Sequence, residues 1–300
     1  MLKDDIITIK SMGKEIRQRL KADFDAVLAV SGADPGIGKT HLGIQLGMQI
    51  DKNFDLDKNI AYLPDDQEII EKFNKIDQYS VLQIDEAGNV LYKLQWMSRM
   101  QQSINQMYMT ERKQNKCTIL CIPRFTDLNE HFRNYRVKFW IWIPTRGVGI
   151  LYRRDDDKDA RDPWHFDDNR RFKRKFWERR GKRMTEITIE ELVKIEKQTT
   201  NYVCHFTFDK LPEELENKYK EYHAKYKKIS QEREIEKQLE SMSTTSKRKE
   251  LMLGKLIGEL IEKTGMTQKE VSELLKCNVA TTNSYLKIGG KRNLDKIMDN

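Results

Sequence analysis

The stretch "AVLAVSGADPGIGKTHLGIQLGMQI", residues 26–50, passes from one apolar run through a glycine-rich loop into a second apolar run. Residues 26–32 have the composition of a buried strand, and residues 41–50 have that of a helix. Between them lies the glycine loop, residues 33–40, which matches [AG]-x-x-x-x-G-K-[ST] with alanine at the first position. Its glycines allow the backbone to curl so that N–H groups point inward at the start of the helix. The stretch therefore predicts a strand–loop–helix unit that holds the phosphates of a nucleotide.

Each part of the glycine loop has an expected role. We expect Lys39 to reach the β- and γ-phosphates, and the hydroxyl of Thr40 to ligate magnesium. The predicted nucleotide-binding residues are Ala33, Asp34, Pro35, Gly36, Ile37, Gly38, Lys39, Thr40 and His41.

An acid pair, Asp85 and Glu86, ends the apolar segment "SVLQIDE" at residues 80–86. The carboxyl end of a strand is the edge where ligands bind in open α/β sheets. We expect Asp85 to hold magnesium through a water molecule and Glu86 to accept a proton from the attacking water. With Lys39 as the other catalytic residue, the sequence predicts ATP hydrolysis with Mg²⁺.

Further apolar segments predict the rest of a sheet. Short apolar strands that alternate with helices indicate an α/β domain whose mainly parallel sheet is covered on both faces. An additional strand is expected between the strand of the glycine loop and that of the acid pair, as in the RecA-like class. The predicted strands are 26–32, 59–64, 80–86, 117–123 and 137–144, with 147–154 as a hairpin partner or edge strand.

The composition changes along the chain and suggests several parts. Residues 96–115 predict an amphipathic helix with a stripe of Met97, Met100, Ile104, Met107 and Tyr108. After Asp155 the sequence becomes charged and less apolar. The predicted division is an N-terminal helical extension at 1–23, the core at 24–155, a basic accessory segment at 156–211, a charged helical connector at 212–246 and a small all-α domain at 247–300.

The order of these motifs resembles a known family. The run 110–143, placed after the acid pair, is similar to P-loop ATPases of the FtsK–HerA branch, and most of all to the zonula-occludens-toxin-like ATPases of phages and of archaeal viruses and plasmids. The resemblance covers roughly residues 24 to 155. It implies a homo-oligomer, often a ring, that hydrolyses ATP between subunits and moves or packages DNA.

The resemblance also implies roles for arginines. Arg112, Arg133 and Arg136 are candidates for a finger inserted into a neighbouring subunit's site, with Arg133 preferred, although a structural role is the commoner one for arginine. Many members of the family end the fourth strand with a glutamine, whereas this chain has Pro123 followed by Arg124. Arg124 is therefore a candidate substitute for that sensor.

A basic stretch, residues 170–183, carries nine basic residues and one acid, so it accounts for the whole formal net charge of +8. Cations neutralise phosphates, and exposed aromatic rings stack on unpaired bases. The alternative is that Phe172 and Phe176 pack inward and that the charges are simply solvated. The predicted nucleic-acid contacts are Arg170, Arg171, Lys173, Arg174, Lys175, Arg179 and Arg180.

Residues 264–287 resemble a helix-turn-helix. Thr267 and Glu270 form an expected capping box, and a turn at 276–278 leads into a second helix at 279–286. In the usual geometry the start of that helix enters the major groove, which places Val279, Thr281, Thr282 and Asn283 against DNA. A unit of this kind that mediates only protein contacts is the alternative.

Composition limits the remaining choices. The chain is 38% hydrophobic and no apolar run approaches the length of a membrane helix, so we expect a cytoplasmic protein. The cysteines, at 117, 121, 204 and 277, lack zinc-ligand spacing and are expected to be reduced and mostly buried.

The sequence leaves three functions open. A DNA motor of a virus or mobile element is preferred. A helicase loader or replication initiator of the AAA+ type is the second, because "GIGKTHLG" is also typical of loaders. The third is a DNA-binding regulator that uses ATP only as a switch.

Overall fold

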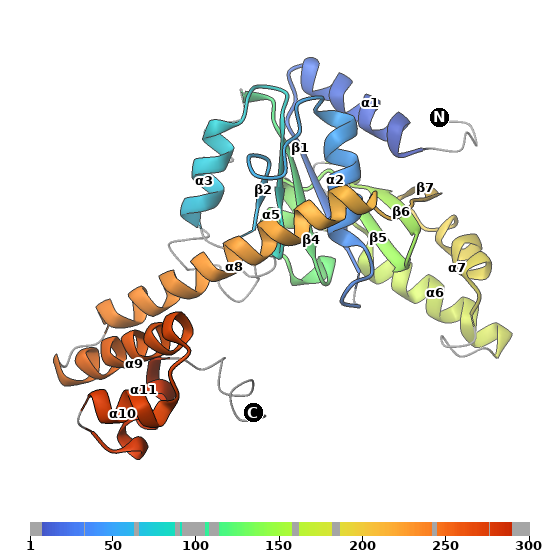
Figure 1. Ribbon diagram of the computed structural model, residues 1–300. Helices are drawn as coiled ribbons and strands as arrows, with labels where there is room; N and C mark the ends of the chain where they lie inside the picture. Colours follow the sequence, from blue (N-terminus) through green and yellow to red (C-terminus); the bar gives the residue numbers. More distant parts are fainter. Residues whose placement is uncertain are drawn as a thin grey trace. The chain divides into compact units, whose positions relative to one another are not determined.

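The computed structural model divides the 300-residue chain into two compact units, Met1–Tyr226 and Lys227–Asn300, which are described separately below (Figure 1). The residues that the structure describes are 8–32, 34–62, 66–87, 91, 106–107, 114–157, 162–181, 187–241, 245–275 and 277–289.

The first unit is built on a seven-stranded sheet with the order β2-β3-β4-β1-β5-β6-β7. The strands from β2 to β5 in this order pair in parallel, and β6 and β7 add to the sheet antiparallel. A mainly parallel α/β sheet was predicted and is confirmed, and it is compatible with a RecA-like core. The strands are β1 (Ala26–Ser31), β2 (Ile60–Ala61), β3 (Val81–Ile84), β4 (Cys117–Ile122), β5 (Phe139–Thr145), β6 (Val148–Arg153) and β7 (Tyr202–Thr207).

The strand β4 lies between β1 and β3, so one strand separates the two motif strands as predicted. In the register of the sheet Ser31 pairs with Ile122, and Ile84 pairs with Leu120. The carboxyl ends of all three strands therefore meet at one edge. This arrangement brings the glycine loop and the acid pair to the same side of the sheet.

Helices cover both faces of the sheet, which is why β1, β3 and β4 are buried along their whole length (Figure 1). On one face α1 (Ile9–Lys21) and α2 (Lys39–Ile50) pack on β1 and β4. On the other face lie α3 (Asp66–Lys75) and α5 (Glu130–Tyr135), together with a 3-10 turn, η4 (Phe125–Asp127).

The sheet extends beyond residue 155, because β7 pairs with β6. No strand was predicted at 202–207. The signal in the sequence is a short alternation, in which Cys204 and Phe206 are buried while His205 and Thr207 are exposed. The described residues between β6 and β7 include two helices, α6 (Phe166–Arg180) and α7 (Ile189–Glu196).

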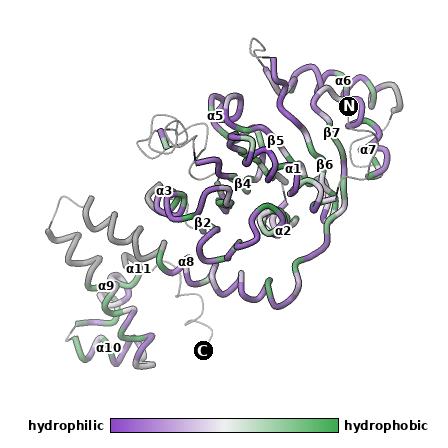
Figure 2. The backbone as a smooth tube through the Cα atoms, turned by 90° about the horizontal axis from the view of Figure 1, so that it is seen from above, coloured by the Kyte–Doolittle hydropathy of each residue, from purple (hydrophilic) through white to green (hydrophobic). Residues whose placement is uncertain are grey.

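The helix α8 (Glu213–Ser241) begins in the first unit and continues into the second. Its first half packs by Leu215 and several tyrosines against Ile44 of α2 and Ile60 of β2. Figure 2 shows this half as mostly hydrophilic, so a small number of side chains hold it on the core. This segment was predicted as a charged helical connector.

The second unit contains α9 (Thr245–Thr264), α10 (Gln268–Leu274) and α11 (Val279–Gly289). Ile257, Val271 and Leu286 form its small core. The predicted capping box is confirmed, since Thr267 caps α10 and Glu270 reaches back to the backbone N–H of Thr267 at 2.7 Å.

Two other predictions concern the chain as a whole. Cys117, Cys121 and Cys204 are buried free thiols and Cys277 is half-buried, as expected. Among the described residues, no helix is both long enough and apolar enough to cross a membrane.

Most of the helix predicted at 96–115 lies outside the described residues. Of its predicted apolar stripe, Met107 is described, and it is buried in the core.

Candidate nucleotide site and basic helix

The glycine loop joins β1 to α2, and of its residues only Ala33 lies outside the described part of the chain. Gly36 and Gly38 have φ angles of +71° and +107°, in the left-handed region that residues with a Cβ rarely adopt. A Cβ at Gly38 would also lie 3.2 Å from the ring of Phe208. The loop therefore requires glycine at these positions, and it leads directly into the N-terminus of a helix, where N–H groups attract an anion.

Two cations border the glycine loop. The amine of Lys39 donates to the carbonyl oxygens of Gly32 at 2.8 Å and Asp34 at 3.3 Å. Arg146, in the turn between β5 and β6, donates to the carbonyl oxygen of Gly36 at 2.6 Å. Arg146 was not predicted, because only the pairing of β5 with β1 brings this turn to the loop.

Thr40 and Asp85 are in direct contact. The hydroxyl of Thr40 donates to Asp85 Oδ1 at 2.9 Å, across 45 positions of the chain. Asp85 follows β3 and its side chain is almost fully buried. The structure thus brings together the hydroxyl and the carboxylate that were predicted separately as magnesium ligands.

Glu86, the second member of the acid pair, is exposed just beyond β3. Its φ angle is +51°, an unusual backbone conformation for a residue with a side chain. Residues held in such conformations cluster at functional sites. The tight turn makes the two acidic side chains point in different directions. Asp85 is buried beside Thr40, while Glu86 faces solvent.

Tyr219 of α8 is a further member of the site that the sequence did not reveal. Its hydroxyl donates to Asp85 Oδ2 at 2.7 Å, so each oxygen of that carboxylate accepts a hydrogen bond. Burial, followed by the negative charge of Asp85, raises the pKa of Tyr219 well above its usual value. The hydroxyl is protonated at neutral pH, as in any tyrosine, and is able to donate to Asp85.

The residues of this edge fit a magnesium nucleotide. Mg²⁺ prefers oxygen ligands and is commonly held by one or two protein oxygens plus the phosphates of its substrate. Thr40 supplies one such oxygen, and the carboxylate of Asp85, 2.9 Å away, could hold the ion through a bound water molecule. The adjoining glycine loop offers N–H groups and two cations, which suit the phosphates.

The chain also contains the pattern N-K-x-D, at residues 74–77, which in GTP-binding proteins reads guanine. Here it covers the end of α3 and the turn before β3. That turn lies at the amino end of β3, whereas Asp85 follows the carboxyl end. The pattern is therefore at the wrong edge of the sheet to contact a base bound at the glycine loop.

The arginines proposed for sensing and for a neighbouring site have different environments. Arg124 is exposed just after β4, beside Pro123, whose carbonyl oxygen accepts from the N–H of Gly32 at 3.2 Å. The guanidinium of Arg133 lies 5.1 Å from the ring centre of Phe166 in its own chain. Arg133 thus has a packing role here. Arg136 is half-buried, and Arg112 lies outside the described residues.

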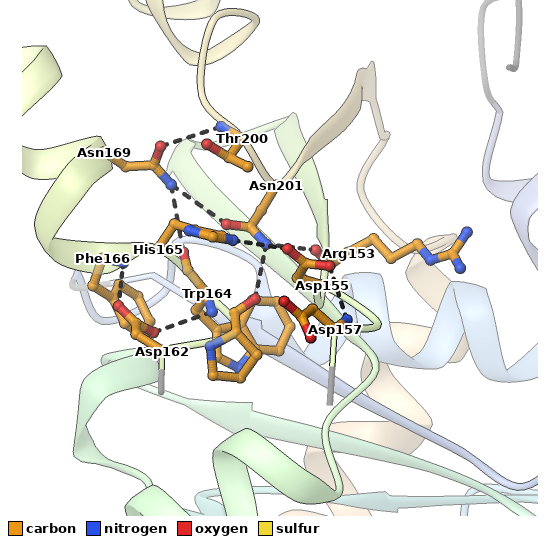
Figure 3. A network of polar contacts seen from close by, with 11 residues as sticks. Arg153, Asp155, Asp157, Asp162, Trp164, His165, Phe166, Asn169, Thr200 and Asn201 are labelled. Atoms are coloured by element: carbon orange, nitrogen blue, oxygen red, sulfur yellow. Dashed lines mark hydrogen bonds and ion pairs between the residues drawn. The ribbon is translucent and has the colours of Figure 1, made fainter. Parts of the chain in front are cut away.

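A polar network fixes the start of the basic helix α6 to the sheet (Figure 3). Asn201, just before β7, donates to the carbonyl oxygens of Arg153 at 2.9 Å and Pro163 at 3.0 Å. Asp162 accepts from the backbone N–H of Phe166 at 2.6 Å. His165 contacts Asp155 at 2.9 Å. Because these bonds tie α6 to β6 and β7, the helix presents its cations on a defined surface.

Not all predicted cations of this helix are available to a nucleic acid. Lys173 pairs with Glu196 at 3.0 Å, and this glutamate, only 1% exposed, also accepts from the hydroxyl of Tyr152. Lys173 is thus corrected to a structural role. Trp177 is buried as well, so it offers no ring to a base.

The remaining cations form a surface group. Arg170, Arg171, Arg174 and Lys175 are exposed. The three arginines and Asp167 line a hollow of about 280 Å³. The side chains of Arg179 and Arg180 lie outside the described part of the structure.

In the second unit, the residues predicted to contact DNA differ in their exposure to solvent. Val279 is 40% exposed and Thr281 and Asn283 are half-buried. Thr282 has no exposed surface, and its hydroxyl lies 3.2 Å from Cys277 Sγ. Thr282 is therefore part of the packing of this unit, and its prediction as a DNA contact is wrong.

Comparisons with known proteins leave the function of the chain open. No protein-family model matches the sequence, and no curated protein matches it. Among solved structures, the chain is similar to the N-terminal domain of zonular occludens toxin from Neisseria meningitidis, at 18% identity and a TM-score of 0.31. The match covers 43% of this chain and 83% of that one. A likeness this weak leaves the role of the chain to be inferred from its own site.

Proposed function

We propose that this protein binds ATP with magnesium at the carboxyl edge of the sheet and hydrolyses it. The contact between Thr40 and Asp85 is the observation that carries the proposal. It joins the end of a glycine loop to the first member of an acid pair, beside a lysine and a helix N-terminus. Loops of this type bind the phosphates of nucleotides by backbone N–H groups.

Each side chain at this edge has a separate role in the proposed hydrolysis. Lys39 and Arg146 supply positive charge to the phosphates. Thr40 would ligate the magnesium ion directly, and Asp85 would hold it through a water molecule. Bound Mg²⁺ would neutralise the charge that develops on the phosphates. Glu86, exposed beside Asp85, accepts a proton from the attacking water.

DNA is the proposed partner of the ATPase, and movement of DNA by a homo-oligomer is the proposed output. The exposed cations of α6 support contact with phosphates, because the polar network holds them on one rigid helix. In this proposal Arg133 reaches a neighbouring subunit after its contact with Phe166 opens.

A second candidate is a regulator that binds DNA through its C-terminal helices and uses ATP as a switch. The observation in its favour is that residues 227–300 form a compact unit of their own, with a separate core. A unit of this kind binds DNA without needing turnover. The two candidates therefore differ in whether DNA stimulates hydrolysis.

The test is hydrolysis of ATP and GTP by the full chain, with and without single- and double-stranded DNA, beside Glu86→Gln. We expect preference for ATP, stimulation by DNA, and loss of turnover by about 100-fold or more in the variant. The variant should still bind ATP, since Glu86 does not hold the phosphates. Slow turnover that is indifferent to DNA would favour the regulator, and turnover unchanged in the variant would remove Glu86 from the mechanism.

A further inference from the structure

The first half of α8 carries an aromatic face, defined as Tyr219, Tyr222 and Tyr226. These tyrosines surround the ring of Tyr62, which follows β2, with ring centres 5.8, 6.5 and 5.0 Å away respectively. Their spacing of three and four residues places them on one side of the helix. The aromatic face therefore docks an otherwise charged segment on the first unit.

One member of this face reaches the nucleotide site. The Tyr219 hydroxyl donates to Asp85 Oδ2 at 2.7 Å, and its ring lies edge-on to that of His41, with 6.5 Å between centres. The other oxygen of Asp85 accepts from Thr40. The plane of the carboxylate is thus fixed from two sides, by the first turn of α2 and by α8.

We propose that Tyr219 is a positioning residue for Asp85, and that the docking of α8 is thereby coupled to binding of the magnesium nucleotide. The inference rests on the proposed function. The carboxylate of Asp85 must accept one hydrogen bond from Thr40 and another from a metal-bound water. It can do both only in one orientation. Partners that orient such groups influence metal affinity although they do not touch the metal.

Coupling of this kind is reciprocal. If docked Tyr219 improves binding of the magnesium nucleotide, then the bound magnesium nucleotide must stabilise docked Tyr219 by the same factor. The helix that carries Tyr219 runs without interruption from residue 213 to residue 241, beyond the end of the first unit. Binding of the magnesium nucleotide therefore stabilises the docked position of the helix that leads into the C-terminal unit.

The structure provides a matched control on the same helix face. The hydroxyl of Tyr226 donates to Asp57 Oδ1 at 2.8 Å and lies 3.4 Å from Lys72 Nζ. This contact also docks α8, but it involves none of the residues of the nucleotide site. Tyr226→Phe and Tyr219→Phe each delete one hydroxyl from the aromatic face, and only the second deletion touches Asp85.

The experiment titrates Mg²⁺ into the full chain with a fluorescent ATP analogue, for the natural sequence, Tyr219→Phe and Tyr226→Phe. Tyr219→Phe should require about 10-fold more Mg²⁺ for half-maximal binding. Tyr226→Phe should stay close to the natural sequence. Hydrogen exchange of residues 213–226 gives a second readout that is independent of turnover. Magnesium and a non-hydrolysable ATP analogue should slow this exchange in the natural sequence and much less in Tyr219→Phe.

The outcomes separate the inference from the function on which it rests. Unchanged magnesium dependence in Tyr219→Phe would overturn the positioning role and leave the ATPase proposal intact. Equal weakening in both variants would also overturn the positioning role of the Tyr219 hydroxyl, because general docking of α8, and not its contact with Asp85, would then be the cause. Failure of the natural sequence to bind the analogue at any Mg²⁺ concentration would overturn the proposed function itself, and the inference with it.

Discussion

The hydroxyl of Thr40 lies 2.9 Å from Asp85 Oδ1, a contact made possible because β1 and β3 end at the same edge of the sheet. Removing the hydroxyl should remove the oxygen proposed to ligate magnesium directly while leaving the glycine loop in place. Thr40→Ser retains the oxygen and is the matched control.

Thr40→Ala should therefore weaken magnesium-dependent binding of ATP by about 10-fold or more, whereas Thr40→Ser should bind nearly as the natural sequence does. Titration of Mg²⁺ at a fixed concentration of ATP analogue measures the difference. If both variants bind alike, the Thr40 hydroxyl does not take part in metal binding.

The pairing of Lys173 with Glu196 predicts that replacing Lys173 lowers the stability of the protein. Lys173→Met leaves the buried carboxylate with fewer partners, so the free energy of unfolding should fall by about 1 to 3 kcal/mol. Arg174→Gln is the control, because Arg174 is exposed and its contact with Glu178, at 3.7 Å, is at the surface. Urea unfolding of both variants measures the difference, and equal stability would contradict the structural role of Lys173.

The exposed arginines of α6 predict a salt dependence. Replacement of Arg170, Arg171 and Arg174 by glutamine should lower affinity for double-stranded DNA and reduce the log–log salt slope by about 3. Binding measured at several salt concentrations tests this. Lys10→Gln/Lys14→Gln, on the exposed side of α1, is the control and should keep the natural slope. An unchanged slope in the triple variant would exclude α6 from the interface.

The C-terminal unit gives a separate prediction about DNA. Val279→Glu places a negative charge on an exposed residue at the start of α11, so it should weaken DNA binding without loss of stability. Thr282→Glu should instead unfold the unit, because that side chain is fully buried. DNA binding and circular dichroism of both variants distinguish the two effects. Undiminished binding by Val279→Glu would argue for a unit that contacts protein.

The sequence was most informative where a backbone requirement and a chemical one coincide. Gly36, Gly38 and Lys39 are constrained within one short loop, and Asp85 ends an apolar run, so the meeting of the glycine loop and the acid pair at one edge could be predicted from local patterns. The roles of Tyr219 and Arg146 could not, since each is brought to the site by pairing or packing with a distant element.

Three other features depend on tertiary packing that local sequence patterns do not reveal. The prediction for Lys173 came from charge alone, and charge does not reveal that a glutamate is buried beneath the helix. The strand β7 was missed because a half-buried edge strand has only a short alternation to mark it. Thr282 was placed on the DNA surface although the fold turns it inward.

Lys138 gives a prediction about pH. It lines a cavity of about 170 Å³ near the start of β5, and its pKa is lowered to about 8, first by burial and then by the nearby Arg154 and Arg19. Asp156 and Asp25 act in the opposite direction. In the unfolded chain a lysine has a pKa of about 10.4, so between about pH 8 and 10.4 the unfolded chain binds more protons than the folded one.

The contribution of Lys138 to stability therefore becomes less unfavourable as pH rises through this window. Lys138→Met should be more stable than the natural sequence at pH 7, and its advantage should shrink between pH 8 and pH 10. Lys138→Arg keeps its charge throughout, so it should fall further below the natural sequence over the same range. Thermal unfolding at several pH values measures both differences. A constant gap for Lys138→Met would show that the folded and unfolded pKa values of Lys138 are the same.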